Sequence, residues 1–467
     1  MRAIKLIPSK RLLIAMLLPW LASFACAERP NVVFIISDDQ GYDDFGFMGN
    51  DQVRTPNLDA LARRSARFPQ GYVPSSVCRP SLATLLTGLY PHEHGIHFNH
   101  PPPGFAKLTR TMDRRGYESA RESAVHLIRQ VPTLPRLLAD AGYRCLQTGK
   151  HWEGHWRDAG FTDGMTTGLP QPGATYGNKQ LANGQWVAHG NGDRGLAIGR
   201  ETMQPIDRFL QDVGDTPFLI WYAPFLPHLP HNSPQRFVDL YGSDLPDHQR
   251  AYFAACSEFD ASVGRLMELV RKQSADRPTL YVFVVDNGFR PDPDQPMRDG
   301  QGFNYTHRSK RSPFEAGVRT PILFAMQDRV NAATHPEPCS SVDIVPTILE
   351  ACGVEVPASI SGRSLWPALT GDASIAPQPV YGEIYPGDAS VLDRPSADVA
   401  YRWVRDGDFK LIVSHPRGGK VWGSYGDQPQ LYDLASDPDE QTNLASDPEF
   451  QSIEQELRTL LDRWWKP

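Results

Sequence analysis

The sequence predicts an α/β fold in which a large, mostly parallel central sheet is flanked by helices. Two apolar runs, residues 31–37 and 280–285, are rich in β-branched and aromatic residues and show no polar alternation. This composition is typical of parallel strands that are covered on both faces. Two further apolar runs, at residues 218–222 and 322–326, are also strand candidates. Residues 251–272 have the pattern of an amphipathic helix. Such alternation along the chain favours a single α/β sheet.

The C-terminal part of the chain has a different pattern. After a linker at residues 371–379, two short strand candidates at 402–404 and 410–413 precede a final helix at 450–465. One side of that helix is apolar, formed by Ile453, Leu457, Leu460, Leu461 and Trp464. We therefore predict a large α/β domain at residues 28–370. A small α+β domain at 371–467 would contain an antiparallel sheet with a helix packed on it.

The N-terminus, residues 1–27, has the features of a signal peptide. Basic residues precede an apolar run at 12–22, and Ala25-Cys26-Ala27 is a small-residue cleavage site. The apolar run is too short to span a bilayer, so we expect no stable membrane insertion. Cleavage after Ala27 predicts a secreted or periplasmic protein. Lipid attachment at Cys26 and an uncleaved N-terminal anchor are the alternatives.

Composition limits the function further. The chain of 467 residues is 40% apolar, enough for a substantial core, and its net charge of −7 disfavours nucleic acid and other polyanions as general partners. Cys339 and Cys352 flank a predicted helix at residues 341–351. Its length of roughly 15 Å would keep them too far apart to bond. We therefore expect a fold that does not depend on disulfides.

Two acidic pairs directly follow the two apolar strands. Asp38-Asp39 comes after the first and Asp286-Asn287 after the second. Ligands of open α/β sheets bind outside the carboxyl ends of the strands, so these side chains are well placed to hold a metal ion. For either pair alone, a helix cap or a turn is the alternative.

A third feature is the run that begins at Cys78. Pro80 suits the first turn of a helix, leucines recur at helical spacing, and Gly88 can end the helix. Cys78 would then lie at a helix N-terminus, where the macrodipole favours an anion and makes a thiol acidic and reactive. A small buried hydrophobic residue is the alternative for an isolated cysteine.

Together these segments resemble the sulfatase family, the formylglycine-dependent sulfate ester hydrolases of the alkaline phosphatase superfamily. The family signature is Cys or Ser, any residue, Pro, Ser or Ala, and Arg, in a helix that ends Leu-Thr-Gly. Here the run is Cys78-Arg79-Pro80-Ser81-Leu82 and ends Leu86-Thr87-Gly88. Other matching segments follow in family order: Thr148-Gly149-Lys150, Pro227-His228, Asp286-Asn287-Gly288, Lys310 with Glu315, Val342-Asp343 and Leu431-Tyr432-Asp433-Leu434 with Glu440. The resemblance implies an alkaline phosphatase-like fold with a small C-terminal domain.

The resemblance also implies the roles of individual residues. Cys78 would be oxidised by the formylglycine-generating enzyme to an aldehyde, whose hydrate offers one hydroxyl to attack sulfur and another to expel the sulfate. Together with residue 78, the implied metal ligands are Asp38, Asp39, Asp286 and Asn287. This oxygen-rich set suits Ca²⁺ before Mg²⁺. Lys150 and Lys310 match the lysines that hold the sulfate, and His228 matches the histidine near the leaving group, our candidate for the general acid.

The sequence departs from the family pattern at three places. Leu82 replaces the family arginine, and we predict that the adjacent Arg79 reaches the same anion. Trp152 occupies the slot of a family histidine, and His151 or His155 could replace that histidine. Residues 101–123 match no motif, and we expect a loop insertion that shapes substrate entry.

The substrate class follows from the same resemblance. We expect a sulfated small molecule or glycan, and aromatic residues near the motifs are candidates for the sugar pocket or for ordinary packing: Tyr90, His92, His94, Trp152 and Trp156. Two other functions compete with a sulfatase. One is a phosphate or phosphonate ester hydrolase of the same superfamily, and the other is a degenerate sulfated-glycan binder in which Cys78 is never converted.

Overall fold

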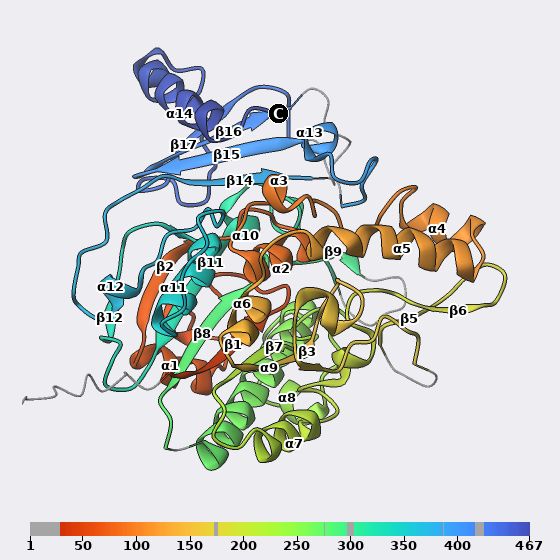
Figure 1. Ribbon diagram of the computed structural model, residues 1–467. Coiled ribbons are helices and arrows are strands. Elements are labelled where there is room, and N and C mark those ends of the chain that lie inside the picture. Colours follow the sequence, from red (N-terminus) through yellow and green to blue (C-terminus); the bar gives the residue numbers. More distant parts are fainter. Residues whose placement is uncertain (1–28, 172–175, 275, 297–302, 386, 416–424) are drawn as a thin grey trace, which may run out of the picture.

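The computed structural model describes residues 29–467 apart from 172–175, 275, 297–302, 386 and 416–424 (Figure 1). The predicted signal peptide therefore lies outside the described residues. Within the described part of the chain, no helix has both the length and the apolar character to cross a bilayer.

The central sheet has nine strands in the described residues, in the order β12-β2-β11-β8-β1-β7-β3-β4, with β13 paired to β2. Their bounds are β1 (Asn31–Ser37), β2 (Ala66–Tyr72), β3 (Arg144–Gly149), β4 (Asp163–Gly164), β7 (Phe218–Ala223), β8 (Thr279–Val285), β11 (Arg319–Ala325), β12 (Ala333–Thr334) and β13 (Cys339–Ser340). Only β11 pairs antiparallel with its neighbours. The predicted mostly parallel sheet is confirmed.

Helices cover both faces of this sheet, because alternate residues of its strands contribute to two different cores. Val32, Phe34 and Ile36 of β1 pack in one apolar cluster with α2, α6 and α11, whereas Val33 and Ile35 pack in another with α1, α7 and α9. The helices that precede the small antiparallel sheet in the chain are α1 (Pro56–Arg63), α2 (Cys78–Thr87), α3 (Pro91–His94), α4 (Phe105–Thr111), α5 (Arg114–Arg129), α6 (Leu134–Asp140), α7 (Gln204–Asp212), α8 (Gln235–Val238), α9 (Asp247–Gln273), α10 (Glu315–Val318), α11 (Ile344–Ala351) and α12 (Trp366–Leu369). Two short hairpins complete it, β5 (Asn178–Gln180) with β6 (Trp186–Ala188) and β9 (Pro291–Pro296) with β10 (Phe303–Tyr305).

A second, antiparallel sheet lies above the first in Figure 1. Its order is β14-β15-β16-β17, and the helix α14 packs on it through Leu457 and Leu461. The bounds are β14 (Val380–Ile384), β15 (Tyr401–Asp406), β16 (Phe409–Ser414), β17 (Gln430–Asp433), α13 (Pro395–Asp398) and α14 (Gln451–Trp464). The small antiparallel sheet with its helix was predicted from the sequence and is confirmed.

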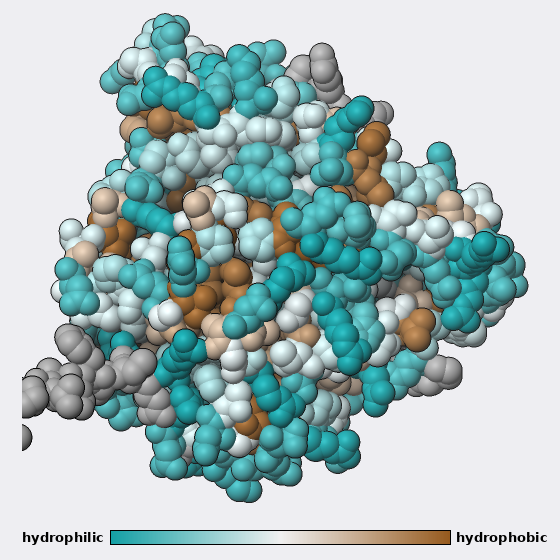
Figure 2. Space-filling view, in the orientation of Figure 1, coloured by the Kyte–Doolittle hydropathy of each residue, from teal (hydrophilic) through white to brown (hydrophobic). Residues whose placement is uncertain are grey.

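The segment at residues 101–123 corrects the sequence prediction of a loop. It forms α4 and the first part of α5, with Asp113 capping α5 by accepting the Gly116 N–H at 2.8 Å. Most of the apolar side of α5 lies beyond residue 123, at Ala124, Val125, Leu127 and Ile128, so the helical period was not visible within the segment. In Figure 2 this side of the molecule is mainly teal and white, because polar side chains cover the outer face.

Two of the candidate sugar-pocket residues contact the C-terminal helix instead. His92 stacks on Trp465 with ring centroids 4.5 Å apart, and Tyr90 meets the edge of Trp464 at 4.9 Å. His94 is buried, with its Nε2 3.3 Å from the Thr84 hydroxyl. These contacts support the packing alternative. The described cysteines, Cys78, Cys145, Cys256, Cys339 and Cys352, are all free and buried.

A buried ionic cluster joins the two sheets. Lys410 of β16 is fully buried, and its Nζ lies 2.9 Å from Glu315 Oε1 and 3.0 Å from Glu440 Oε1. Glu440 also accepts the Glu315 N–H at 2.7 Å, and the Tyr72 hydroxyl donates to Glu315 Oε2 at 2.7 Å. Glu315 begins α10, five residues after Lys310. The small sheet thus holds the segment that carries Lys310.

Removing the charge of Lys410 should destabilise the protein strongly. We expect Lys410→Met to lower the free energy of unfolding by about 3–5 kcal/mol, because two buried carboxylates would lose their shared cation. Urea denaturation measures this change. Lys466→Met is the matched control, since that lysine side chain is 76% exposed. A loss of under about 1 kcal/mol for Lys410→Met would show that the cluster contributes little.

Candidate functional site

The candidate site lies where β1 and β8 end. The two strands pair in parallel, with Ser37 opposite Val285. The residues that follow, Asp38-Asp39 and Asp286-Asn287, therefore leave the sheet side by side, and all four are at most 2% exposed. The Asp39 N–H donates to Asp286 Oδ1 at 3.0 Å, which links the two pairs directly.

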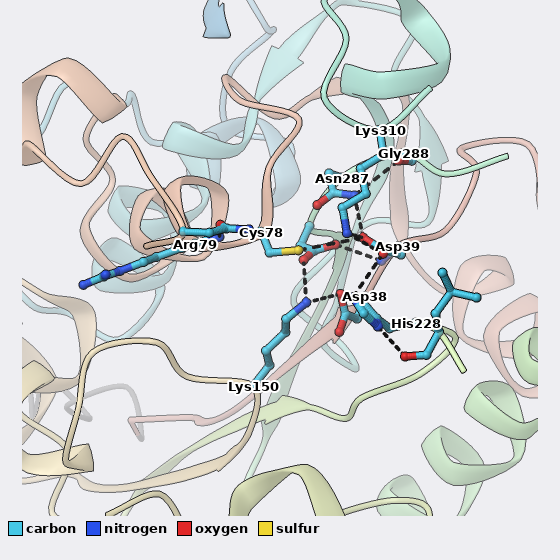
Figure 3. A network of polar contacts seen from close by, with 12 residues as sticks. Asp38, Asp39, Cys78, Arg79, Lys150, His228, Asn287, Gly288 and Lys310 are labelled. Carbon is cyan, nitrogen blue, oxygen red and sulfur yellow. Dashed lines mark hydrogen bonds and ion pairs between the residues drawn. The ribbon is translucent and has the colours of Figure 1, made fainter. Parts of the chain in front are cut away.

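Cys78 meets these carboxylates from the start of α2. Its Sγ lies 3.9 Å from Asp39 Oδ1 (Figure 3). Val77 before it is extended, Pro80 falls in the first turn, and Gly88 ends the helix with φ of 69°. The predicted position of Cys78 at a helix N-terminus is confirmed.

The thiol is not acidic, contrary to the sequence prediction. Burial raises the pKa of Cys78 to about 12, although Lys150 and Lys310 act in the opposite direction. Desolvation of the thiolate, in a site that also holds Asp39 and Asp286, outweighs the effect of both lysines. An unmodified Cys78 is therefore a protonated thiol at neutral pH.

Two lysines neutralise the acidic pairs. The Lys310 ammonium contacts both oxygens of Asp39, at 2.6 and 2.5 Å, and Lys150 forms an ion pair with Asp38 and lies 3.8 Å from Asp286 Oδ2. Burial alone would raise the pKa of Asp39, but Lys310 and His228 hold it well below its usual range. Asp38 and Asp286 behave differently, because burial outweighs Lys150 and raises the pKa of both.

Oxygen atoms remain without partners at the centre of the site. Asp38 Oδ2, Asp286 Oδ2 and Asn287 Oδ1 are buried and accept no hydrogen bond from any residue that the structure describes. Ligand atoms of Asp38, Asp39, Cys78 and His228 lie within 4.8 Å of one another. Unpaired buried carboxylate and amide oxygens are costly in a protein, and they are the donors that hard cations prefer. The residues present therefore fit a divalent cation.

His228 lies on the open side of this cluster. Its Nδ1 lies 2.6 Å from the Leu229 carbonyl oxygen and its Nε2 3.4 Å from Asp39 Oδ2. Because a carbonyl only accepts, Nδ1 carries a hydrogen and Nε2 is the nitrogen that faces the site. The ring stacks on Phe225 with centroids 4.3 Å apart, which fixes its orientation.

Comparison with known proteins identifies the family. The sequence profile described as Sulfatase matches residues 30–354, well over half of the chain. The chain belongs to the sulfatase family. A second profile, described as the C-terminal part of N-sulphoglucosamine sulphohydrolase, matches residues 304–466. The protein is thus a sulfate ester hydrolase with a candidate metal site at Asp38, Asp39, Cys78 and His228.

Individual relatives cover nearly the whole chain. The sulfatase is 28% identical to arylsulfatase A of Homo sapiens, over 92% of this chain and 86% of that protein. It is 24% identical to an ulvan-active sulfatase of Formosa agariphila, over 95% of this chain and 81% of that protein. A phosphonate monoester hydrolase of Agrobacterium radiobacter has the same fold, with a TM-score of 0.65 at 19% identity over 93% of this chain and 95% of its own.

The structure does not support the predicted role of Arg79 in binding the sulfate. Its guanidinium points away from the carboxylates (Figure 3) and forms a bidentate pair with Glu153, at 2.8 and 2.7 Å. Arg79 is fully buried and lies over the ring of Phe98. Leu82, at the position of the family arginine, is 3% exposed and packs in the core. No charge from the helix therefore replaces the missing arginine.

Neither predicted substitute for the family histidine reaches the carboxylates. His151 is buried against Phe161, with ring centroids 5.8 Å apart, and neither ring nitrogen has a hydrogen-bond partner among the described residues. His155 caps a short helix at residues 156–159 by accepting the Arg157 N–H. Trp152, in the family slot, contacts His100 and His189 instead. No sequence motif marked His100 and His189, because both lie far along the chain from Trp152.

Substitution of Arg79 should lower the stability of the fold and should have no specific effect on substrate binding. Arg79→Leu leaves the Glu153 carboxylate buried without its partner, so we expect the free energy of unfolding to fall by about 3–5 kcal/mol. Glu153→Gln retains a hydrogen-bonding group and should cost less. A variant with unchanged unfolding in urea but a raised KM would instead indicate that Arg79 holds the substrate.

Proposed function

We propose that this protein removes sulfate from an alcohol or sugar sulfate ester, with a nucleophile formed from Cys78 and a bound divalent cation. The observation that carries the proposal is the position of the Cys78 sulfur, 3.9 Å from Asp39 in a buried cluster of carboxylates and lysines. A buried thiol with a raised pKa is a poor nucleophile at neutral pH. Oxidation of Cys78 to formylglycine would supply a hydrated aldehyde oxygen in its place.

The proposed metal ligands are Asp38, Asp39, Asp286 and Asn287, with residue 78 beside them. Their oxygen-only donor set favours Ca²⁺ before Mg²⁺. When bound, the cation would polarise a sulfate oxygen and the nucleophile. The buried oxygens of Asp38, Asp286 and Asn287 support this assignment, since a cation would contact atoms that accept no hydrogen bond from the described residues.

Charge balance supports a monoanionic substrate. Three aspartates and two lysines leave the site with one net negative charge when all are ionised. A divalent cation would change this to one net positive charge, which matches the single negative charge of a sulfate ester. Lys150 and Lys310 would then turn from the carboxylates toward the sulfate oxygens. His228 would act from its imidazolium form: protonated also at Nε2, the nitrogen that faces the cluster from the open side, it would donate that proton to the leaving alcohol.

The relatives favour a sulfated sugar as the natural substrate. One relative is named an ulvan-active sulfatase, and the profile of the C-terminal part is named after a sulphoglucosamine enzyme. Small aryl sulfates would be accepted as well. We also propose export from the cytoplasm, on the basis of the N-terminal pattern at residues 1–27. Sequencing the mature N-terminus would show whether cleavage occurs after Ala27.

The two alternative functions differ from this proposal in the state of residue 78 or in the substrate. A phosphonate hydrolase shares the fold, which by itself does not distinguish the two activities. A glycan binder with an unconverted Cys78 is favoured by Leu82, which removes the family arginine. The two experiments below separate these cases.

Mass spectrometry of the peptide that contains residue 78 tests the nucleophile. In protein made together with the formylglycine-generating enzyme, we expect an aldehyde at position 78 and release of sulfate from 4-nitrophenyl sulfate. Cys78→Ala should abolish turnover. A quantitative thiol would favour the binder, and faster release of phosphonate than of sulfate would favour the phosphonate hydrolase.

Thermal unfolding with added Ca²⁺ tests the metal site without relying on activity. Ca²⁺ at about one hundred times its dissociation constant should stabilise the wild type by about 2.7 kcal/mol, since it binds the folded state selectively. Asp286→Ala should lose this stabilisation and also turnover, because one ligand is missing. Asp276→Ala, a substitution at an exposed residue of another segment, should retain both the stabilisation by Ca²⁺ and turnover. Equal stabilisation of Asp286→Ala and wild type would mean that Ca²⁺ binds elsewhere.

A further inference from the structure

An aromatic wall lies beside the candidate site. It consists of His100, Phe105 and His189, which come from the chain before α4, from α4 itself and from the chain after β6. The His100 ring stacks on Phe105 with centroids 4.2 Å apart, and His189 lies 5.0 Å from Phe105 and 5.3 Å from His100. In Figure 1, α4, α5 and the hairpin of β5 and β6 lie together on one side of the molecule.

Trp152 connects this wall to Lys150. Both histidines meet its ring, at 5.4 and 5.7 Å between centroids. Trp152 follows Lys150 by two residues, so their backbones are at most about 7 Å apart. The charge of Lys150 accordingly contributes to lowering the pKa of His189 to about 3, after burial and the charges of Arg121 and Lys179. The wall therefore begins next to the lysine proposed to hold the sulfate.

The histidines of the wall are neutral and can donate hydrogen bonds. Arg121 of α5 lies behind them, with its Nη1 3.4 Å from His100 Nδ1. A guanidinium only donates, so Nδ1 accepts and the neutral His100 ring carries its hydrogen at Nε2. Burial, followed by the proximity of His189 and the charge of Arg121, lowers the pKa of His100 well below its usual range. A neutral imidazole beside a phenyl ring suits the hydroxyl groups and apolar face of a sugar.

Positive charge is in excess around the wall. The Lys179 ammonium lies 5.5 Å from the centroid of Phe105, and Lys179 and Phe105 are both half-buried. Arg311, which directly follows Lys310, lies against Gly387 and contributes to the low pKa of His100. With Arg121 this makes three cations, in addition to Lys150, which is paired with Asp38. Two acids face the same region: Asp388, which accepts the Phe105 N–H at 3.0 Å, and Asp193, which lies near Arg121.

We propose that His100, Phe105 and His189 bind the sugar ring that carries the cleaved sulfate, and that Lys179 recognises a second anionic group on the same sugar. This inference rests on the proposed function and deepens it, since it names a doubly anionic sugar as the substrate class. Lys150 and Lys310 would be occupied by the sulfate that is cleaved. Lys179, whose ammonium lies against Phe105 of the wall, would then pair with a second sulfate or a carboxylate.

Direct binding tests the inference independently of turnover. In the Cys78→Ala background, titration calorimetry would compare D-glucosamine 6-sulfate with its 2-N,6-O-disulfate, and N-acetylgalactosamine 6-sulfate with its 4,6-disulfate. We expect at least one pair to show about ten-fold tighter binding of the disulfated sugar. Lys179→Ala should reduce this preference to under about three-fold, and Lys179→Arg should retain it. Lys107→Ala, an exposed position on α4, is the matched control.

A second variant tests the wall itself. His189→Ala should weaken the binding of both sugars of a pair by about three- to ten-fold, because the imidazole contacts the ring they share. The inference is overturned if neither pair shows a preference, if the preference survives in Lys179→Ala, or if His189→Ala binds both sugars as before. Failure of the proposed function would appear differently, as no release of sulfate from any sulfated substrate by converted wild-type protein.

Discussion

Three carboxylates lie close together in one buried cluster of this protein, and the surrounding structure offsets their electrostatic repulsion. The parallel pairing of β1 with β8 places Asp38, Asp39 and Asp286 side by side, where burial penalises every negative charge. Lys150 and Lys310, from the end of β3 and from the segment before α10, supply the opposite charge. The protein also leaves oxygens of this cluster unpaired. A site of this kind is balanced only partly by its own residues, and a divalent cation would complete it.

The small C-terminal sheet takes part in this balance indirectly. Lys410 holds Glu315, and Glu315 begins the helix that directly follows the Lys310 segment. Glu440, from the chain after β17, closes the same cluster. The position of the Lys310 ammonium at the candidate site therefore depends on residues far along the chain. For this reason Glu440, although it lies in the C-terminal part of the chain, helps to hold a segment between β8 and β11 of the large sheet.

The strands and the polar pairs that follow them were predictable because they depend on local patterns. An unbroken apolar strand followed by Asp-Asp or Asp-Asn indicates both the element and the edge of the sheet at which these side chains emerge, as β1 and β8 show. The direction of a side chain at a helix start depends instead on tertiary packing. Arg79 was predicted to reach the sulfate, but Glu153 lies on the other side and binds it. The histidines near Trp152 were missed for the same reason, since their neighbours come from four separate segments.

The burial of α2 has a consequence for biosynthesis. Every residue of this helix is buried, and the sulfur of Cys78 lies below the surface among charged groups. An enzyme that modifies Cys78 needs an extended, accessible peptide, and the native chain does not offer one. Conversion of Cys78 would therefore have to precede folding, so the two processes would compete in time. A chain that folds faster would then retain more unmodified thiol at position 78.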